Sequence, residues 1–228
     1  IIFTKKNMRL LRTFFFGLCA LTLFSCEGSY NKLDNLLESE FEGKVKTSNE
    51  GNNIIVVFQE MKNLLNVSPI ELDYYVSRVA TVVIDYVGRT NFIGFSQLRV
   101  DIAPLQRSYE YPTNITVKAL EKLPVVAEVQ RLLNQEEHIE LLKKFDDIIT
   151  AEMFEEQVLK EWNDLKQWNN KDVTPKYIGF KLLQLPGEEE YFIRIGGRVE
   201  NKQGEFALVE FMFTDVSKKI MSITITDL

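Results

Sequence analysis

Apolar and polar residues alternate in four short runs near the C-terminal end of the chain, over residues 177–185, 191–199, 206–213 and 220–226. In the second run, Ile193 and Ile195 alternate with Arg194, a pattern typical of a strand with one face on a core and the other partly exposed. Turn-forming residues separate the runs at Pro186-Gly187, 201–204 and 214–219. Because such short connections join antiparallel neighbours, the pattern predicts a four-stranded antiparallel meander.

Helical periodicity precedes these runs. Residues 117–133 have a helical pattern that Pro124 interrupts, and residues 136–149 continue it. The next segment, 150–165, places four apolar residues on one stripe of a helix: Phe154, Val158, Trp162 and Leu165. The expected fold class is therefore α+β, with helices packed on a curved four-stranded antiparallel sheet in the C-terminal half.

The first half of the chain has fewer regular patterns. Residues 54–58 form a compact apolar run typical of a strand, and Ser68-Pro69 is a helix-start signal followed by helical spacing as far as Gly88. Imperfect alternation predicts a strand within 92–102. Residues 104–115 have little periodicity and contain two prolines, which favours a boundary between two units. We therefore expect a small αβ unit before the C-terminal domain.

The N-terminal end of the chain has the pattern of an export signal. Residues 14–23 are apolar, and four basic residues precede them: Lys5, Lys6, Arg9 and Arg12. The apolar stretch is shorter than the roughly 20 residues that a spanning helix needs, so we expect export and cleavage. The segment Leu23-Phe24-Ser25-Cys26 resembles the lipobox of bacterial lipoproteins, in the looser form of Bacteroidota lipoproteins.

This resemblance implies that Cys26 is the lipid attachment residue and that its acyl chains hold the protein in a membrane of the cell envelope, with the outer membrane favoured over the inner. A signal without lipidation and a buried cysteine are the alternatives. The following polar segment reads as a tether, although a short docked helix through Leu33, Leu36, Leu37 and Phe41 is an equal alternative. The expected organisation is a signal peptide at 1–25, anchor and tether at 26–53, the αβ unit at 54–115 and the α+β domain at 116–228.

Net charge and cysteine content exclude some classes of partner and of chemistry. The chain has 27 basic and 33 acidic residues, and loss of residues 1–25 would leave 23 basic against 33 acidic, a formal charge of −10. Nucleic acid is therefore not expected as a partner, because its recognition needs a concentrated basic surface. The only cysteines are Cys19, inside the signal, and Cys26, so a disulfide, thiol catalysis and a cysteine metal site are not expected in the mature chain.

The order of elements from residue 119 to residue 228 resembles the cystatin-like or NTF2-like α+β cone fold. The resemblance depends on helices followed by a long antiparallel sheet, on the helix that carries Phe154 and Trp162, and on the final strand at Lys219-Ile220-Met221-Ser222-Ile223. A fold of this kind implies a pocket between the Trp162 helix and the concave face of the sheet, but it transfers no function.

Few residues in the chain suggest chemistry. The single histidine, His138, lies in an acidic helical run and is expected on the surface. Gly196-Gly197-Arg198 falls inside a strand, where a bulge that bends the sheet is expected rather than a phosphate-binding loop. The candidate ligand pocket is formed by Trp162, Phe180, Arg194 and Arg198, with the two arginines available to an anionic ligand. No catalytic, metal or cofactor site is expected.

Our leading hypothesis is a lipid-anchored, non-enzymatic envelope protein that acts as a binding or assembly module with a protein partner. Two alternatives remain at this level. The first is a carrier of a small apolar or anionic ligand in the concavity of the sheet. The second is an isomerase, dehydratase or hydrolase of the NTF2-like type, which would need a carboxylate or His138 with a perturbed pKa at the mouth of the cone.

Replacing Cys26 with alanine tests the anchor. The Cys26→Ala variant should no longer be labelled metabolically with fatty acid and should no longer be recovered with the membranes, because it lacks the thiol that carries the lipid. Labelling that stays unchanged in this variant would contradict the lipoprotein hypothesis.

Overall fold

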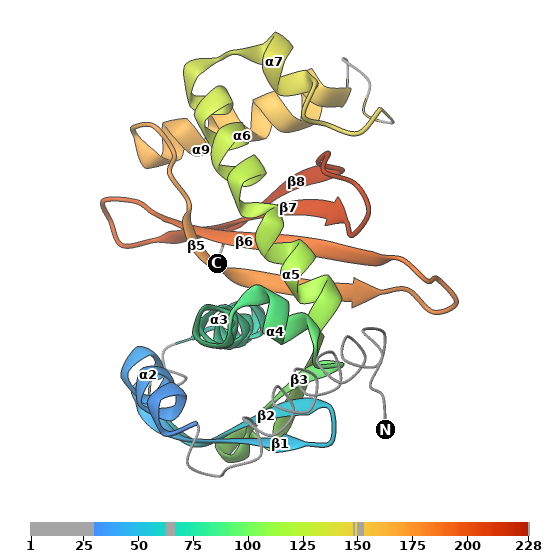
Figure 1. Cartoon of the computed structure of the whole chain (residues 1–228). Helices are drawn as coiled ribbons and strands as arrows, with labels where there is room; N and C mark the ends of the chain where they lie inside the picture. The colour runs from blue at the N-terminus through green and yellow to red at the C-terminus, as the bar shows by residue number, and fades with distance from the viewer. Residues whose placement is uncertain (1–29, 63–66, 148, 150–152, 228) are drawn as a thin grey trace, which may run out of the picture.

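The computed structural model describes residues 30–62, 67–147, 149 and 153–227. Two four-stranded sheets lie on either side of a long central helix, and a further group of helices covers the outer face of the second sheet (Figure 1). The expected signal peptide and Cys26 lie outside the described residues. Within the described ranges, no helix combines the length and the apolar character needed to cross a membrane.

The first sheet has the strand order β1-β2-β3-β4, with β2 and β3 parallel and the other neighbours antiparallel. The central helix, α3, connects the two parallel strands. The elements of this part are α2 (Asn31–Phe41), β1 (Gly43–Glu50), β2 (Asn53–Met61), α3 (Pro69–Val87), the short α4 (Arg89–Ile93), β3 (Gln97–Ile102), the 3₁₀ turn η2 (Ala103–Leu105) and β4 (Arg107–Pro112).

The structure corrects the expectation of a tether. The described part of this segment, from residue 30 onward, contains α2 and β1. The alternative of a docked helix is therefore the one observed. Leu33, Leu37 and Phe41 are fully buried, while Leu36 points outward and is half exposed. The Phe41 ring lies edge-on against the rings of Phe58 in β2 and Tyr75 in α3. This segment is therefore part of the core of the first sheet.

Helix α3 begins and ends where the sequence predicts. Ser68 and Glu71 form a capping box, Pro69 occupies the first turn, and Gly88 is the C-cap with φ of +80°. Its buried residues lie all around the helix rather than on one stripe, because both sheets contact it. A helix that is buried on two sides needs apolar residues on two sides.

The second sheet is the predicted antiparallel meander, in the order β5-β6-β7-β8. Helices α5 and α6 meet at Lys122 and Pro124, so the predicted interruption is also confirmed. The elements of this part are α5 (Thr113–Glu121), α6 (Leu123–Gln135), α7 (His138–Leu142), the π-helical turn η3 (Phe154–Leu159), α9 (Lys160–Asn169), β5 (Lys176–Gln184), β6 (Tyr191–Glu200), β7 (Phe206–Thr214) and β8 (Ser222–Asp227).

Two expected elements differ from the structure. The helix expected over 136–149 ends early, as α7, because the chain turns and Phe145 forms a parallel bridge with Ile220. The segment 104–115, expected as a boundary between two units, contains β4, the last strand of the first sheet. The chain then passes through α5 to the second sheet, and the buried apolar side chains of both sheets form one continuous cluster.

Glycines allow α3 to approach the second sheet closely. Gly179 in β5 has φ of +139°, and a Cβ there would lie 1.7 Å from the Tyr74 carbonyl oxygen of α3. A Cβ on Gly196 would lie 2.8 Å from the Tyr74 ring. The expected bulge is present, but its extra residue is Ile178 in β5, opposite Gly196 and Gly197, rather than a glycine of β6. The glycines of β6 therefore serve close packing.

A Gly179→Ala substitution tests this contact. We expect the free energy of unfolding to fall by more than about 3 kcal/mol, because the new methyl group overlaps the backbone of α3 and the positive φ adds strain. Gly204→Ala is the control, since Gly204 also has a positive φ, of +81°, but open space around it, and should cost only about 1 kcal/mol. If urea unfolding gave the same loss of unfolding free energy for both variants, the close approach of α3 to β5 would not be what requires glycine at position 179.

Candidate functional site

The structure does not bring the four expected pocket residues together. Trp162 in α9 is buried, and its ring N–H donates to Asn134 Oδ1 of α6 at 3.3 Å. Phe180 in β5 is also buried and lies edge-on against Tyr111. Arg194 and Arg198 lie on the opposite face of the second sheet, the face that α3 covers.

Both arginines are already paired with carboxylates on that face. Arg198 lies 3.7 Å from Glu71 of α3, and its guanidinium stacks on the Phe206 ring at 3.2 Å. Arg194 lies 3.8 Å from Glu210 of β7. The anionic ligand expected for these arginines is therefore replaced by two glutamates of the chain itself.

Tyr74 also lies between α3 and the second sheet. Together with Glu71, Arg194, Arg198 and Glu210 it forms a polar strip. Its hydroxyl donates a hydrogen bond to Glu210, and the Lys181 ammonium lies 4.3 Å from the centre of its ring. Burial raises the pKa of the Tyr74 phenol well above its ordinary value, and the hydrogen bond to Glu210 raises it further. Tyr74 therefore keeps its proton at neutral pH and acts as a fixed donor, which gives the strip a structural role.

An apolar hollow lies on the other face of the sheet, beside α6. It has a volume of about 190 Å³. Helix α6 provides Leu123, Val126, Ala127 and Gln130, and the sheet side provides Pro175, Tyr177, Ile195, Gly196, Gly197 and Phe211. Gly197 shapes this wall, because a Cβ at that position would lie 2.6 Å from the Pro175 Cβ. The close packing of Pro175 on the strand therefore needs glycine.

Tyr177 is the one ionisable residue in the lining of this pocket. Its hydroxyl is buried near the buried hydroxyl of Thr81 in α3, and the interaction with Thr81 offsets part of the effect of burial on the Tyr177 pKa. Burial raises the pKa of the Tyr177 phenol to about 12, so it is uncharged at neutral pH. A neutral pocket with mostly apolar walls suits an apolar group.

The remaining candidates for chemistry lie elsewhere. His138 is exposed at the first residue of α7, as the sequence predicts, and does not line the pocket. Among the described side chains, no three histidine, cysteine, aspartate or glutamate residues are placed to hold a metal ion. The sequence analysis missed three of the pocket residues, Tyr177, Ile195 and Phe211, which come from three different strands, β5, β6 and β7.

Comparison with known proteins gives no relative for this chain, since no family model matches it and no curated protein or solved structure matches it significantly. The fold class is therefore assigned from the structure alone: it is α+β, with one mixed and one antiparallel sheet.

A Tyr74→Phe substitution tests the polar strip. At pH 7 we expect a loss of about 2 kcal/mol in the free energy of unfolding, because Glu210 loses its buried donor. Because the pKa of Tyr74 is higher in the folded state, the protonated phenol contributes its full stabilisation below the ordinary tyrosine pKa of about 10. This contribution to the free energy of unfolding is lost as the pH rises through the folded-state pKa. The difference between wild type and variant should therefore shrink above pH 10.

Tyr75→Phe is the matched control, because the Tyr75 hydroxyl has no hydrogen bond to a described residue. Urea unfolding at pH 7 and in alkaline buffer measures both variants. A Tyr75→Phe loss as large as that of Tyr74→Phe would contradict the role of the Glu210 bond.

Proposed function

We propose that the chain is an exported, lipid-anchored protein of the bacterial envelope whose folded part binds a protein partner rather than catalysing a reaction, with the outer membrane favoured over the inner. The anchor rests on the pattern that ends at Cys26. The observation that carries the binding function is the apolar pocket beside α6.

The size of the pocket indicates what enters it. Its volume of about 190 Å³ is below the range of roughly 300–1,000 Å³ that is common for sites of drug-sized ligands. It is closer to a cavity of about 150 Å³, which holds a single benzene. One aromatic or branched aliphatic side chain of a partner fits this space, and such anchors buried in pockets dominate many protein interfaces.

A second candidate is a carrier of a small apolar ligand, favoured by the same lining. The anionic version of this carrier loses support, because Arg194 and Arg198 are paired with Glu210 and Glu71 on the other face of the sheet. The NTF2-like enzyme needs an ionisable group of perturbed pKa that titrates near neutrality. The Tyr177 phenol, with a pKa of about 12, does not meet that need.

We also propose that the C-terminal part belongs to the cystatin-like or NTF2-like cone type. The support is the arrangement of α6 and α9 on one face of a four-stranded antiparallel meander, in the order expected for that fold (Figure 1). The pocket then lies between a helix and the sheet, as in a cone. Helix α3 on the opposite face is an addition to that arrangement.

An Ala127→Phe substitution tests the pocket. Ala127 is exposed and lines the pocket, so a phenyl group there should fill it without entering the core. After crosslinking of the anchored protein in its native cells, mass spectrometry should show a recurrent envelope partner with the wild type and at least about tenfold less of it with the variant.

Ala103→Phe is the control, since Ala103 is an exposed alanine of η2, the turn between β3 and β4. It should recover the partner as the wild type does. Equal recovery from all three proteins would remove the pocket from the interface. Recovery of a tightly held apolar molecule in place of a protein would support the carrier.

A further inference from the structure

Two Lys-Lys pairs that are far apart in the sequence lie side by side in the structure. Phe145 and Ile220 form a parallel bridge, in which the Asp146 N–H donates to the Ile220 carbonyl and the Ile220 N–H donates to the Lys144 carbonyl, both at 2.8 Å. Phe145 and Ile220 are both buried. The bridge therefore holds the segments Lys143-Lys144 and Lys218-Lys219 next to each other, between the end of α7 and the β7–β8 loop (Figure 1).

These four lysines line a surface pocket of about 370 Å³. The other lining residues are Pro124, Val125 and Glu128, from the first two turns of α6. Glu128 is the single acidic residue of the lining, and Arg131 holds it through two hydrogen bonds, Nε to Oε2 at 3.0 Å and Nη2 to Oε1 at 3.2 Å. Arg131, which also pairs with Glu137 at 3.0 Å, therefore balances part of the charge of Glu128 outside the pocket.

The lysines are only partly neutralised. Lys143 pairs with Glu140, and Lys219 pairs with Asp147, whose side chain is 91% exposed. Exposed pairs of this kind are weak and exchange readily for another anion. The side-chain ammonium groups of Lys144 and Lys218 have no hydrogen bond or ion pair with any described residue. Within the described residues, the pocket therefore presents two ammonium groups that no carboxylate pairs with.

A second layer of lysines lies behind this pocket. Lys122 is buried and donates to the Ser217 carbonyl at the base of the β7–β8 loop. Lys118 pairs with Asp215 of the same loop at 2.6 Å, and the Asp215 carboxyl also accepts from the Tyr191 N–H at 3.0 Å. Burial lowers the pKa of Lys122, and the charges of Lys118 and Lys218 lower it further against the pull of Asp215 and Glu121. These contacts fix the loop that carries Lys218 and Lys219.

We infer that this pocket binds an anion that carries a phosphoryl group, held by Lys144 and Lys218 with Lys143 and Lys219 at its rim. Lysine ammonium groups bind phosphate as point charges, and a ligand with two or more negative charges uses several of them at once. The concentration of lysines contrasts with the acidic chain as a whole, whose formal charge is −6. The inference is independent of the apolar pocket, which lies on the other side of α6.

The phosphoryl group has two sources, a soluble phosphate ester or the headgroup of a phospholipid. The full chain, purified in a nonionic detergent, is titrated with inorganic pyrophosphate by calorimetry, and then mixed with micelles that contain phosphatidylglycerol or phosphatidylcholine. Binding of pyrophosphate alone supports a soluble ester. Binding to phosphatidylglycerol micelles alone supports a headgroup, and both outcomes support the site.

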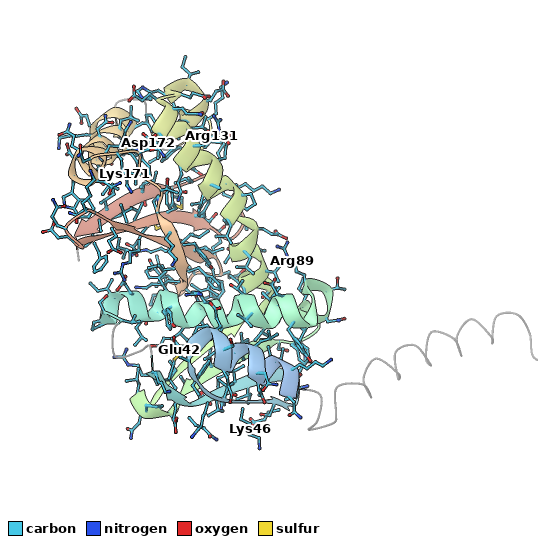
Figure 2. The ribbon with its side chains drawn as sticks, turned by 90° about the vertical axis from the view of Figure 1, so that its left-hand side faces the viewer. Glu42, Lys46, Arg89, Arg131, Lys171 and Asp172 are labelled. Carbon is cyan, nitrogen blue, oxygen red and sulfur yellow. The ribbon has the colours of Figure 1, made fainter. Side chains whose placement is uncertain are left out.

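The Lys144→Gln/Lys218→Gln double variant should weaken the observed binding by roughly tenfold or more, because it removes the two free charges. The control is Lys171→Gln/Lys202→Gln, which changes the net charge equally at two exposed lysines outside the pocket; Lys171 is labelled at the end of α9 in Figure 2. The control should bind as the wild type does, and all three proteins should share one urea midpoint. Wild type that binds neither probe, or equal weakening in both double variants, would overturn the inference.

Discussion

The contact between α3 and β5 is the constraint on which the rest of the structure depends. The Ser77 hydroxyl accepts a hydrogen bond from the Phe180 N–H at 2.7 Å and donates one to the Tyr74 carbonyl at 2.6 Å. These bonds connect a buried helix and a strand through their backbones, at a separation that leaves no room for a Cβ on Gly179. Buried backbone groups need such partners, so the bonds also satisfy the edge of the second sheet where the bulge interrupts it.

Because α3 is shared, the two sheets are not independent layers. The helix is the crossover between β2 and β3 and also the cover of one face of the second sheet (Figure 2). Its second interface is partly polar, with Glu71 and Tyr74 matched to Arg198 and Glu210. Paired and hydrogen-bonded groups of this kind fix the register between a helix and a sheet more closely than apolar contact alone.

The two proposed binding sites lie on the other side of the second sheet, away from α3. Helix α6 lies on that face, and the two hollows described above flank its N-terminal half. One has neutral apolar walls, and the other is lined by lysines. Their separation by a single helix means that an apolar group and an anion would be held a short distance apart, on elements that are rigidly packed against the core.

The sequence by itself determined the elements whose signals are local. Strand alternation with short turns determined the meander, and the capping residues Ser68 and Gly88 determined the ends of α3, because both depend on neighbours in the chain. The Pro124 interruption between α5 and α6 is local in the same sense.

Only the tertiary structure decided which faces meet. The segment expected as a tether folds because Leu33, Leu37 and Phe41 find a core that the segment cannot build alone. Arg194 and Trp162 separate because α3 and α9 cover opposite faces of one sheet, and strand alternation shows that two faces exist but not which helix lies on each. The lysine pocket likewise depends on a bridge between residues 145 and 220, a long-range contact that no local pattern of the chain encodes.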